Sequence, residues 1–286
     1  MISLKKFIYT IFLLFSHLIR AYEYDLTVCC IFQDEAPYLK EWIDYHRKLG
    51  VDHFILYNNS STDDWEKVLH KYIKKGVVEV VDWPNLWPDL FFGYHCQPYA
   101  YKDCISKMLG KTEWLAIIDT DEFIIPMQDK NLKKCLKNHY SIASAIFVNW
   151  LQFGTSGIHL PEGYPILPYL TKCSDRSHEW NKIGKTIIRP EAFHDMGDPH
   201  FCILKPGFEY SDGDGWHHGY DWKHHEALIR INHYTFRDEN CLWNRKAPRW
   251  KFTKEEMIKK NQEYCVSEDT FIFRFINVKS SARHLE

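Results

Sequence analysis

Short apolar runs alternate with amphipathic segments through the first half of the chain. The apolar runs are predicted strands, because a strand buried on both faces reads as a nearly continuous hydrophobic stretch. The segments between them are predicted helices, since their apolar residues recur at helical spacing, and Gly50 and Gly76 stand where helices end. The strands are predicted at 26–32, 51–57, 77–81 and 114–118, and the helices at 38–49, 65–75 and 97–109.

Strands that alternate with helices predict an α/β fold whose sheet is mostly parallel, Rossmann-like and flanked by helices. Open sheets of this kind bind ligands at the carboxyl ends of their strands. Polar side chains follow each of the four predicted strands: Asp34, Asn58 with Asn59, Asp82, and Asp119 with Asp121. We therefore expect a binding site along this edge of the sheet.

The alternation stops after Phe123, and the second half of the chain predicts a less regular architecture. One large domain with two unlike halves is the simplest organisation for 286 residues. The elements expected in the second half are strands at 145–150, 185–189 and 228–234, loops at 154–163 and 211–219, and a charged helix at 254–264.

The first 21 residues have a separate character. Lys5 and Lys6 precede an uncharged apolar stretch at 7–19, which is short for a membrane span of about 20 residues and typical of a secretory signal. We predict that 1–21 is a signal peptide or a signal anchor, which places the protein in the secretory pathway or at a membrane, in a Golgi lumen or a bacterial envelope. A buried first helix is the alternative, and it would leave the protein cytoplasmic.

Composition excludes some functions and leaves others open. The formal net charge of −2 provides no basic field that would recruit nucleic acid. The nine cysteines include no CxxC pair, which argues against a structural zinc site. Aromatic residues reach 16%, with 11 Trp, and these rings serve either as core or as platforms that stack on sugars or nucleobases.

Asp119 and Asp121 form an Asp-X-Asp motif directly after a predicted buried strand. On a strand both side chains would face the same way, and in a turn they could be brought together, so either geometry lets them reach one ion. Paired carboxylates suit Mg²⁺ or Mn²⁺, particularly when phosphate oxygens complete the shell. Such an ion would stabilise the charge on a departing nucleoside diphosphate. An acidic surface turn is the alternative.

Two histidines are candidates for a third ligand of this ion. His233 leads because it ends a predicted strand, and His200 is second. A purely structural role is the alternative for each of them.

Several segments in a fixed order carry a resemblance to a known family. They span residues 26 to about 250 and lie at 30–35, 41–46, 50–54, 57–61, Gln97, 114–123, 153–157 and 232–234. In these segments the chain resembles glycosyltransferase family 92 and the related family-2-like group of GT-A enzymes. The resemblance implies a GT-A fold, a UDP-sugar donor, an Mn²⁺ or Mg²⁺ ion and inverting transfer of a hexose, galactose, to a glycan or other hydroxyl acceptor.

The resemblance also implies an internal organisation. Residues 24–286 are expected to form one catalytic domain, made of a nucleotide-binding half at 24–125, an acceptor-side half at 126–250 and a C-terminal helical extension at 251–286. Asp119 and Asp121 match the metal motif, with Asp121 the direct ligand. The expected donor-binding residues are Asp34 and Glu35 on the nucleotide side, Asn58 and Asp82 at the uracil or ribose, and Gln97 in a matched position.

Lys185 is a further candidate for contact with the diphosphate, because Lys serves as a point charge for phosphate, and a plain surface position is its alternative. An inverting enzyme also needs a general base, for which Asp175, Glu179 and Asp195 are candidates, with an ordinary solvated carboxylate as the alternative for each. Two other functions stay open. They are a metal-dependent phosphoester hydrolase that activates water with the same carboxylates and an inactive carbohydrate-binding protein on the same fold.

Overall fold

The fold is that of a computed structural model, which describes residues 22–84, 96–212, 215–217, 223, 228–250 and 252–277. The predicted signal segment at 1–21 lies outside these residues. Within the described ranges, no helix has the length and apolar character needed to cross a bilayer.

The first half of the chain builds a parallel sheet in which β1 lies between β2 and β4, and β3 follows β2 at the edge. The α/β class expected from the sequence is confirmed, and the predicted ends differ from the observed ones by at most two residues. The strands are β1 (Tyr24–Phe32), β2 (His53–Asn58), β3 (Val78–Asp82) and β4 (Thr112–Ile117), and the helices are α2 (Ala36–Lys48), α3 (Trp65–Lys74) and α4 (Cys96–Met108).

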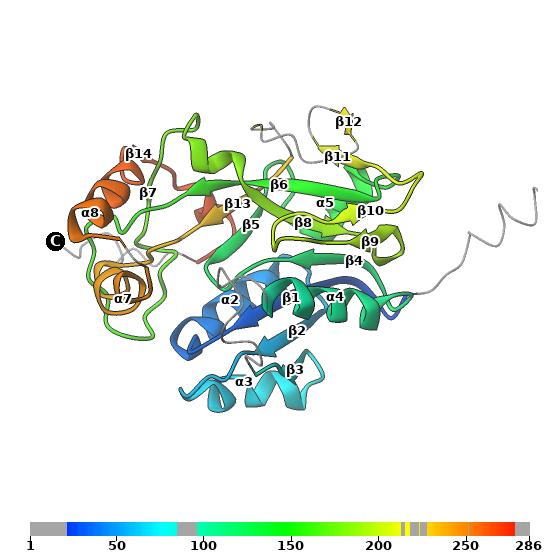
Figure 1. The fold of residues 1–286 in the computed structure, drawn as a ribbon, viewed down its shortest axis with the longest axis horizontal. Helices are drawn as coiled ribbons and strands as arrows, with labels where there is room; N and C mark the ends of the chain where they lie inside the picture. Colours follow the sequence, from blue (N-terminus) through cyan, green and yellow to red (C-terminus); the bar gives the residue numbers. More distant parts are fainter. Residues whose placement is uncertain are drawn as a thin grey trace, which may run out of the picture.

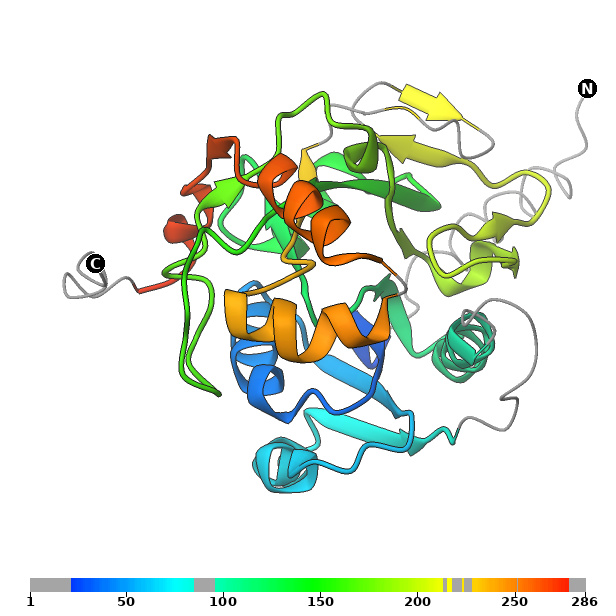
Figure 2. The same ribbon diagram turned by 60° about the vertical axis from the view of Figure 1, so that its left-hand side comes forward.

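β1 is buried on both faces, which explains its continuous apolar run. Val28 and Cys30 pack into a core with α2 and α3, whereas Cys29 and Ile31 pack into a second core with α4. Helices α2 and α4 therefore cover opposite faces of the sheet (Figure 2).

The expected parallel order holds in the first half of the chain, whereas the sheet becomes mixed in the second half. β8 pairs antiparallel with β4 and β6, and β13 pairs antiparallel with β5 but parallel with β6 (Figure 1). Parallel neighbours need long crossover connections, and the second half lacks the regular crossover helices of the first. These strands are β5 (Glu122–Pro126), β6 (Ala145–Gln152), β8 (Gly184–Ile188), β11 (Tyr210–Asp212), β12 (Gly215–His217) and β13 (Ile229–His233).

The sequence did not predict β5, α5 (Leu132–His139) or the pairing of β11 with β12, which stands in a stretch expected to be a loop. The two halves of the chain still share one core, because Val28 of β1, Val148 of β6 and Ile231 of β13 belong to the same buried cluster. The short elements are β7 (Lys172–Cys173), η1 (Glu179–Lys182), η2 (Pro190–Ala192), β9 (Phe193–Asp195), β10 (Ile203–Leu204), β14 (Ser267–Glu268) and η4 (Phe271–Arg274).

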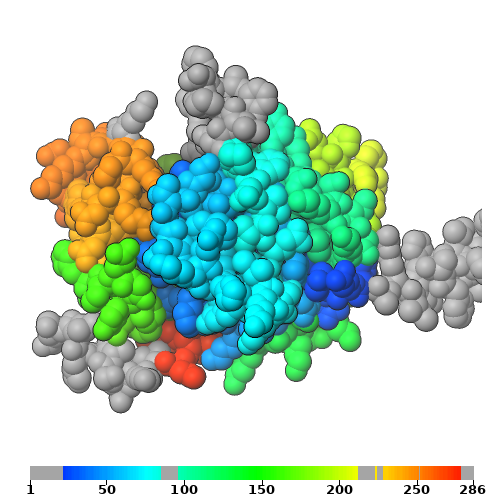
Figure 3. All heavy atoms as spheres, turned by 90° about the horizontal axis from the view of Figure 1, so that it is seen from below, coloured from blue at the N-terminus to red at the C-terminus, as the bar shows by residue number. Residues whose placement is uncertain are grey.

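A helical segment at 239–249, which we name the strap, runs beside the start of α2 (Figure 2). It consists of α6 (Glu239–Cys241), the π-helix η3 (Leu242–Lys246) and α7 (Ala247–Arg249), and α8 (Lys254–Glu263) follows it. Seen from below, the strap, in orange, borders the blue first half of the chain (Figure 3). The strap therefore lies where it can add side chains to the carboxyl edge of the sheet.

Candidate active site

A cavity of about 820 Å³ lies at the carboxyl end of β4. Residues 118–121 form the tight turn between β4 and β5, and this turn contributes Asp119 and Asp121 to the lining. The remaining lining comes almost entirely from the second half of the chain and includes three lysines, two histidines and several aromatic rings. The carboxylates predicted from the sequence thus face a space large enough for a ligand.

Asp119 is held by three partners. Its Oδ2 lies 2.9 Å from Nζ of Lys185, and its Oδ1 accepts a hydrogen bond of 3.0 Å from the hydroxyl of Tyr101. Its backbone N–H donates to Oε2 of Glu122 at 2.8 Å. Burial raises the pKa of Asp119, but the ammonium of Lys185 outweighs burial, so that the pKa lies below its usual value.

Lys185 on β8 is completely buried. Burial lowers its pKa, but the carboxylates of Asp119 and Glu122 outweigh that effect and raise the pKa, so the side chain is an ammonium. Glu122 is also completely buried, and burial raises the pKa of its carboxyl well above the usual range. Lys185 and Asp119 form the ion pair of this group.

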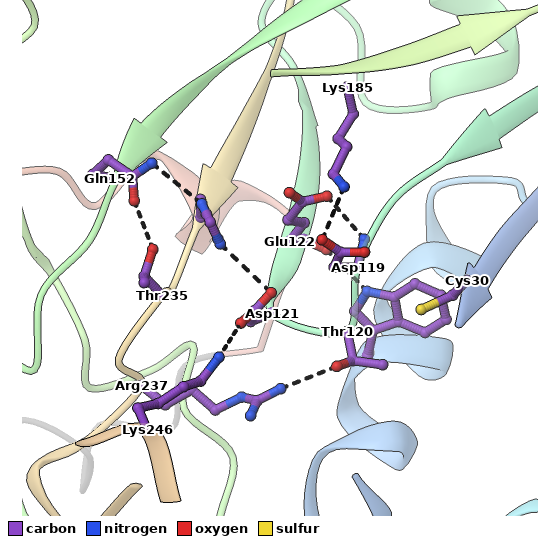
Figure 4. A network of polar contacts seen from close by, with 12 residues as sticks. Cys30, Asp119, Thr120, Asp121, Glu122, Gln152, Lys185, Thr235, Arg237 and Lys246 are labelled. Atoms are coloured by element: carbon purple, nitrogen blue, oxygen red, sulfur yellow. Dashed lines mark hydrogen bonds and ion pairs between the residues drawn. The ribbon is translucent and has the colours of Figure 1, made fainter. Parts of the chain in front are cut away.

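Asp121 has a different pair of partners. Its Oδ2 lies 2.7 Å from Nζ of Lys246 on the strap, and its Oδ1 lies 3.6 Å from Nε2 of His233. Burial raises the pKa of Asp121, but Lys246 and His233 together bring it well below the usual value. Figure 4 shows the resulting arrangement, in which Lys185 reaches Asp119 and Lys246 reaches Asp121 from a different part of the chain.

His233 is fixed on its other side. Its Nδ1 lies 3.2 Å from Nε2 of Gln152. Oε1 of Gln152 in turn accepts a hydrogen bond of 2.7 Å from the hydroxyl of Thr235 (Figure 4). The ring of His233 also packs on Trp150, with centroids 4.3 Å apart. The imidazole is thereby held with Nε2 toward Asp121.

His200 lines the same cavity with a different hydrogen-bonding pattern. Its Nδ1 lies 3.1 Å from the carbonyl oxygen of Gly184, and a carbonyl can only accept, so the ring carries its proton on Nδ1. Burial, assisted by the charge of Lys185, lowers the pKa of His200 to about 4. The ring is therefore neutral near pH 7 and presents an unprotonated Nε2.

The family assignment agrees with this geometry. The family model described as Glycosyltransferase family 92 matches residues 24–270. The chain belongs to glycosyltransferase family 92. It is 25% identical over 221 residues to a family 92 protein of Ricinus communis and 27% identical over 224 residues to one of Oryza sativa subsp. japonica. These matches cover 74% and 76% of the chain but 36% and 34% of the relatives, so the chain spans about a third of their length.

Solved structures show a distant likeness in fold. TarS of S. aureus in complex with UDP-GlcNAc is 14% identical, with a TM-score of 0.38 over 59% of this chain and 46% of that one. Glucosyl-3-phosphoglycerate synthase from Mycobacterium tuberculosis, in complex with Mn²⁺, UDP and glucosyl-3-phosphoglycerate, is 18% identical, with a TM-score of 0.28 over 44% of each chain.

Some of the donor-binding residues expected in this family 92 chain line the cavity, and others do not. Gln97 and Lys185 are in the lining. Asn58, whose Oδ1 accepts the N–H of Ser61 at 3.0 Å, closes the loop after β2 and does not line it. Asp82 lies exposed at the end of β3, also outside the lining.

Asp34 and Glu35 lie beside the cavity, where their hydrogen bonds and ion pairs connect separate parts of the chain. Asp34 accepts the N–H of Thr62 at 2.7 Å and has a positive φ of 54°. Buried Glu35 accepts the hydroxyl of Thr120 at 3.0 Å and pairs with Arg237 and Arg245. Glu35 therefore ties the Asp-X-Asp turn to the second half of the chain and does not face the cavity.

The three base candidates lie on the surface and not in the cavity lining. Asp175 accepts hydrogen bonds from Ser177, two residues further along the chain. Glu179 and Asp195 form ion pairs with Lys182 at 3.2 Å and Lys102 at 2.6 Å. The geometry gives none of these carboxylates a place beside a substrate in this cavity.

The sequence analysis missed Lys246 and Gln152. Lys246 stands in the π-helix, where the extra residue per turn changes which side chains face the sheet, and π-helical turns are frequent at functional sites. Gln152 is the last residue of β6, a strand that the sequence predicts to end at residue 150. The basic run Arg245-Lys246 and the N-cap residue Asp238 are sequence signals that could have indicated the strap.

The Lys185 ion pair yields a prediction about stability. Lys185→Met keeps the length of the side chain but leaves the partly buried Asp119 without its cation, so we expect a loss of about 1–3 kcal/mol in the free energy of unfolding at pH 7. Because the folded pKa of Asp119 is depressed, its contribution is present at neutral pH, begins to decline as pH falls below about 4, and is lost as pH falls through the folded pKa, where the free energies of unfolding of the two proteins should converge. Urea unfolding at several pH values measures both.

Lys182→Met is the matched control, since Lys182 pairs with Glu179 at the surface. It should change the free energy of unfolding by less than about 0.5 kcal/mol. Equal changes in the free energy of unfolding in the two variants would show that the Lys185–Asp119 pair contributes no more to stability than a surface pair.

Proposed function

We propose that this family 92 chain is a glycosyltransferase that moves a hexosyl group, galactose, from a UDP-sugar to a hydroxyl of a glycan acceptor. The transfer proceeds with inversion and uses a bound Mn²⁺ or Mg²⁺ ion. The observation that carries the proposal is the pair Asp121 and His233, which share the cavity with the ammonium groups of Lys185 and Lys246. Family membership supports the reaction class, and the family resemblance supports galactose.

The chemistry of Asp121 and His233 fits a divalent ion. Their Oδ1 and Nε2 are 3.6 Å apart, and two ligands each about 2.1 Å from one ion lie roughly 3 to 4 Å apart. No cluster of three or more His, Cys, Asp or Glu side chains with metal-site geometry occurs in the described ranges. Asp119 is engaged by Lys185, so Asp121 and His233 would hold the ion, and donor phosphate oxygens and water would supply its remaining ligands.

Gln152 is suited to set the tautomer that metal binding requires. A metal-bound Nε2 leaves the His233 proton on Nδ1, which then needs an acceptor. A half-turn of the Gln152 amide places its carbonyl oxygen against Nδ1 and its amino group against the hydroxyl of Thr235, which accepts as well as donates. The same two contacts thus serve His233 with and without the ion.

Lys246 and Lys185 provide positive charge for the diphosphate. The ion, when bound, acts as a Lewis acid that stabilises the charge of the departing UDP. Lys246 is partly exposed on the strap and can turn from Asp121 to a phosphate oxygen, whereas buried Lys185 stays on Asp119. Gln97, from the start of α4, offers an amide to the donor at the same side of the cavity.

His200 is the lining residue best suited to accept the proton of the acceptor hydroxyl. Asp119 and Asp121 each face an ammonium, and His233 faces Asp121. His200 is neutral, and its Nδ1–H is fixed on the carbonyl of Gly184, which leaves Nε2 as the basic atom. We assign it the role of general base.

The alternative of a phosphoester hydrolase receives less support. Such enzymes use carboxylates and histidines around two ions to activate water, and the described part of the chain presents no such cluster. An inactive carbohydrate-binding protein would have no need of buried acidic and cationic groups that face one another across the same cavity.

Metal dependence is tested by Asp121→Asn and His233→Gln, each of which removes one ligand while preserving its shape. We expect Mn²⁺ affinity in the presence of UDP, measured by electron paramagnetic resonance, to fall by roughly tenfold or more. Release of UDP from UDP-galactose in the presence of acceptor should disappear in both variants and, in the wild type, on addition of EDTA. Asp175→Asn, at an exposed site, should change neither quantity.

A donor screen completes that test. UDP-galactose should support faster turnover than UDP-GlcNAc, UDP-glucose or a GDP-sugar. Unchanged Mn²⁺ affinity in both ligand variants would falsify the metal site, and UDP release that is independent of acceptor would favour the hydrolase.

Lys246→Met tests the exchange of partners at Asp121. Without UDP, the variant should bind Mn²⁺ about tenfold more tightly, because the competing ammonium is gone. With Mn²⁺ present, it should bind UDP about tenfold more weakly, because a charged phosphate contact is lost. Calorimetric titration measures both, with exposed Lys254→Met as the control. If the affinities for Mn²⁺ and for UDP both rose or both fell in Lys246→Met, that result would contradict the exchange of partners.

His200→Gln tests the general base. Turnover should fall by about 100- to 10,000-fold, while the affinity for UDP and Mn²⁺ stays at the wild-type value. Since the imidazole must be unprotonated and its pKa is about 4, wild-type activity should not depend on this group between pH 6 and 8 and should fall as pH drops toward its pKa. Exposed His159→Gln is the control, and turnover within threefold of wild type in His200→Gln would exclude the role.

A further inference from the structure

The side of the cavity formed by η1, α8 and the segment before α8 is aromatic and takes no part in the donor site. Trp180, Trp250, Phe252 and Tyr264 line it, together with Lys260. Trp180 and Phe252 are 45% and 48% exposed, which is unusual for rings of their size. Large exposed rings at a cavity wall are suited to the apolar faces of a ligand.

Lys260 is held among these rings. Its Nζ lies 4.0 Å from the ring centroid of Trp180 and 5.5 Å from those of Trp250 and Phe252. Three ring faces near one ammonium fix its position by cation–π attraction. The aromatic wall therefore carries a positive charge at a defined place.

The other two lysines of the lining are paired, and Lys260 is not. Lys185 faces Asp119 and Lys246 faces Asp121, whereas no carboxylate of the described residues lies within ion-pair distance of Lys260. The carboxylate of Glu263, whose charge raises the pKa of Lys260, lies 3.6 Å from Nε2 of His178. Burial lowers the pKa of Lys260, as expected for a cation whose desolvation is not offset by an anion.

We propose that this wall is the acceptor subsite and that the acceptor is a saccharide carrying an anionic group, which pairs with Lys260 while a sugar ring packs on the aromatic side chains. The inference rests on the proposed function, because it names the substrate class of the same cavity. A charge-assisted contact from a fixed ammonium gives orientation as well as affinity. It would hold the acceptor with a hydroxyl toward His200 and the donor end of the cavity.

The test compares methyl β-glucuronide with methyl β-glucoside, two sugars that differ only in a carboxylate at C6. Binding to the wild type is measured by calorimetry with and without UDP and Mn²⁺. We expect the glucuronide to bind about tenfold more tightly. In Lys260→Met the ratio should fall to about one, and in Lys260→Arg, which keeps the charge, the preference should persist.

Lys259→Met is the matched control, since Lys259 is the exposed neighbour on the same helix and does not line the cavity. It should keep the tenfold ratio, and Trp180→Leu should weaken both sugars alike. The proposal is overturned if the wild type binds the two sugars equally or binds neither, or if the preference survives Lys260→Met. Titration of UDP and Mn²⁺ into the same proteins reports separately on the donor site, so a failure of the proposed function is distinguishable from a failure of this inference.

Discussion

The balance of charge at the turn between β4 and β5 is the constraint on which the rest of the structure depends. Asp121 is buried there and Asp119 is partly buried, and a carboxylate removed from water without a partner is destabilising. The partners are Lys185 from β8 and Lys246 from the strap, both supplied by the second half of the chain. The first half is therefore incomplete by itself, and the halves are joined by charge as well as by their shared core.

Arg237 also connects the turn between β4 and β5 to the second half of the chain. It is buried, has a φ of 54°, and donates to Glu35 and to the hydroxyl of Thr120, with its guanidinium 3.7 Å from the ring centroid of Tyr38. A left-handed backbone at a non-glycine residue costs on the order of 1 kcal/mol, and it persists because the surrounding contacts fix the side chain. The turn is thus held by cations from both directions, which preorganises its two carboxylates.

The sequence predicted the parts of the site that depend on local order. The strands of the first half and the polar residues at their ends follow from short apolar runs, and so Asp119 and Asp121 were found. The donor-binding roles predicted for Asp34 and Glu35 depend on which side chains contact these residues. The contacting side chains are Arg237 and Arg245, which lie about 200 residues further along the chain. Short irregular connections in the second half give no periodic signal, and the sequence analysis predicted neither the strap nor the pairing of β8 between β4 and β6.

The three lysines of the cavity differ in whether they can leave one anionic partner for another. Lys185 is completely buried and also contacts the carbonyl of Pro199, so an arriving diphosphate has no means of drawing it from Asp119. Lys246 is partly exposed, and a divalent ion on Asp121 would displace it toward the phosphates. Lys260 has no carboxylate partner among the described residues, so its charge would be available to a ligand that brings an anion of its own. In the proposed function, the donor end of the cavity would replace one cation with another, whereas the aromatic end would complete an ion pair, and this difference would let the two substrates bind side by side without competing for the same charge.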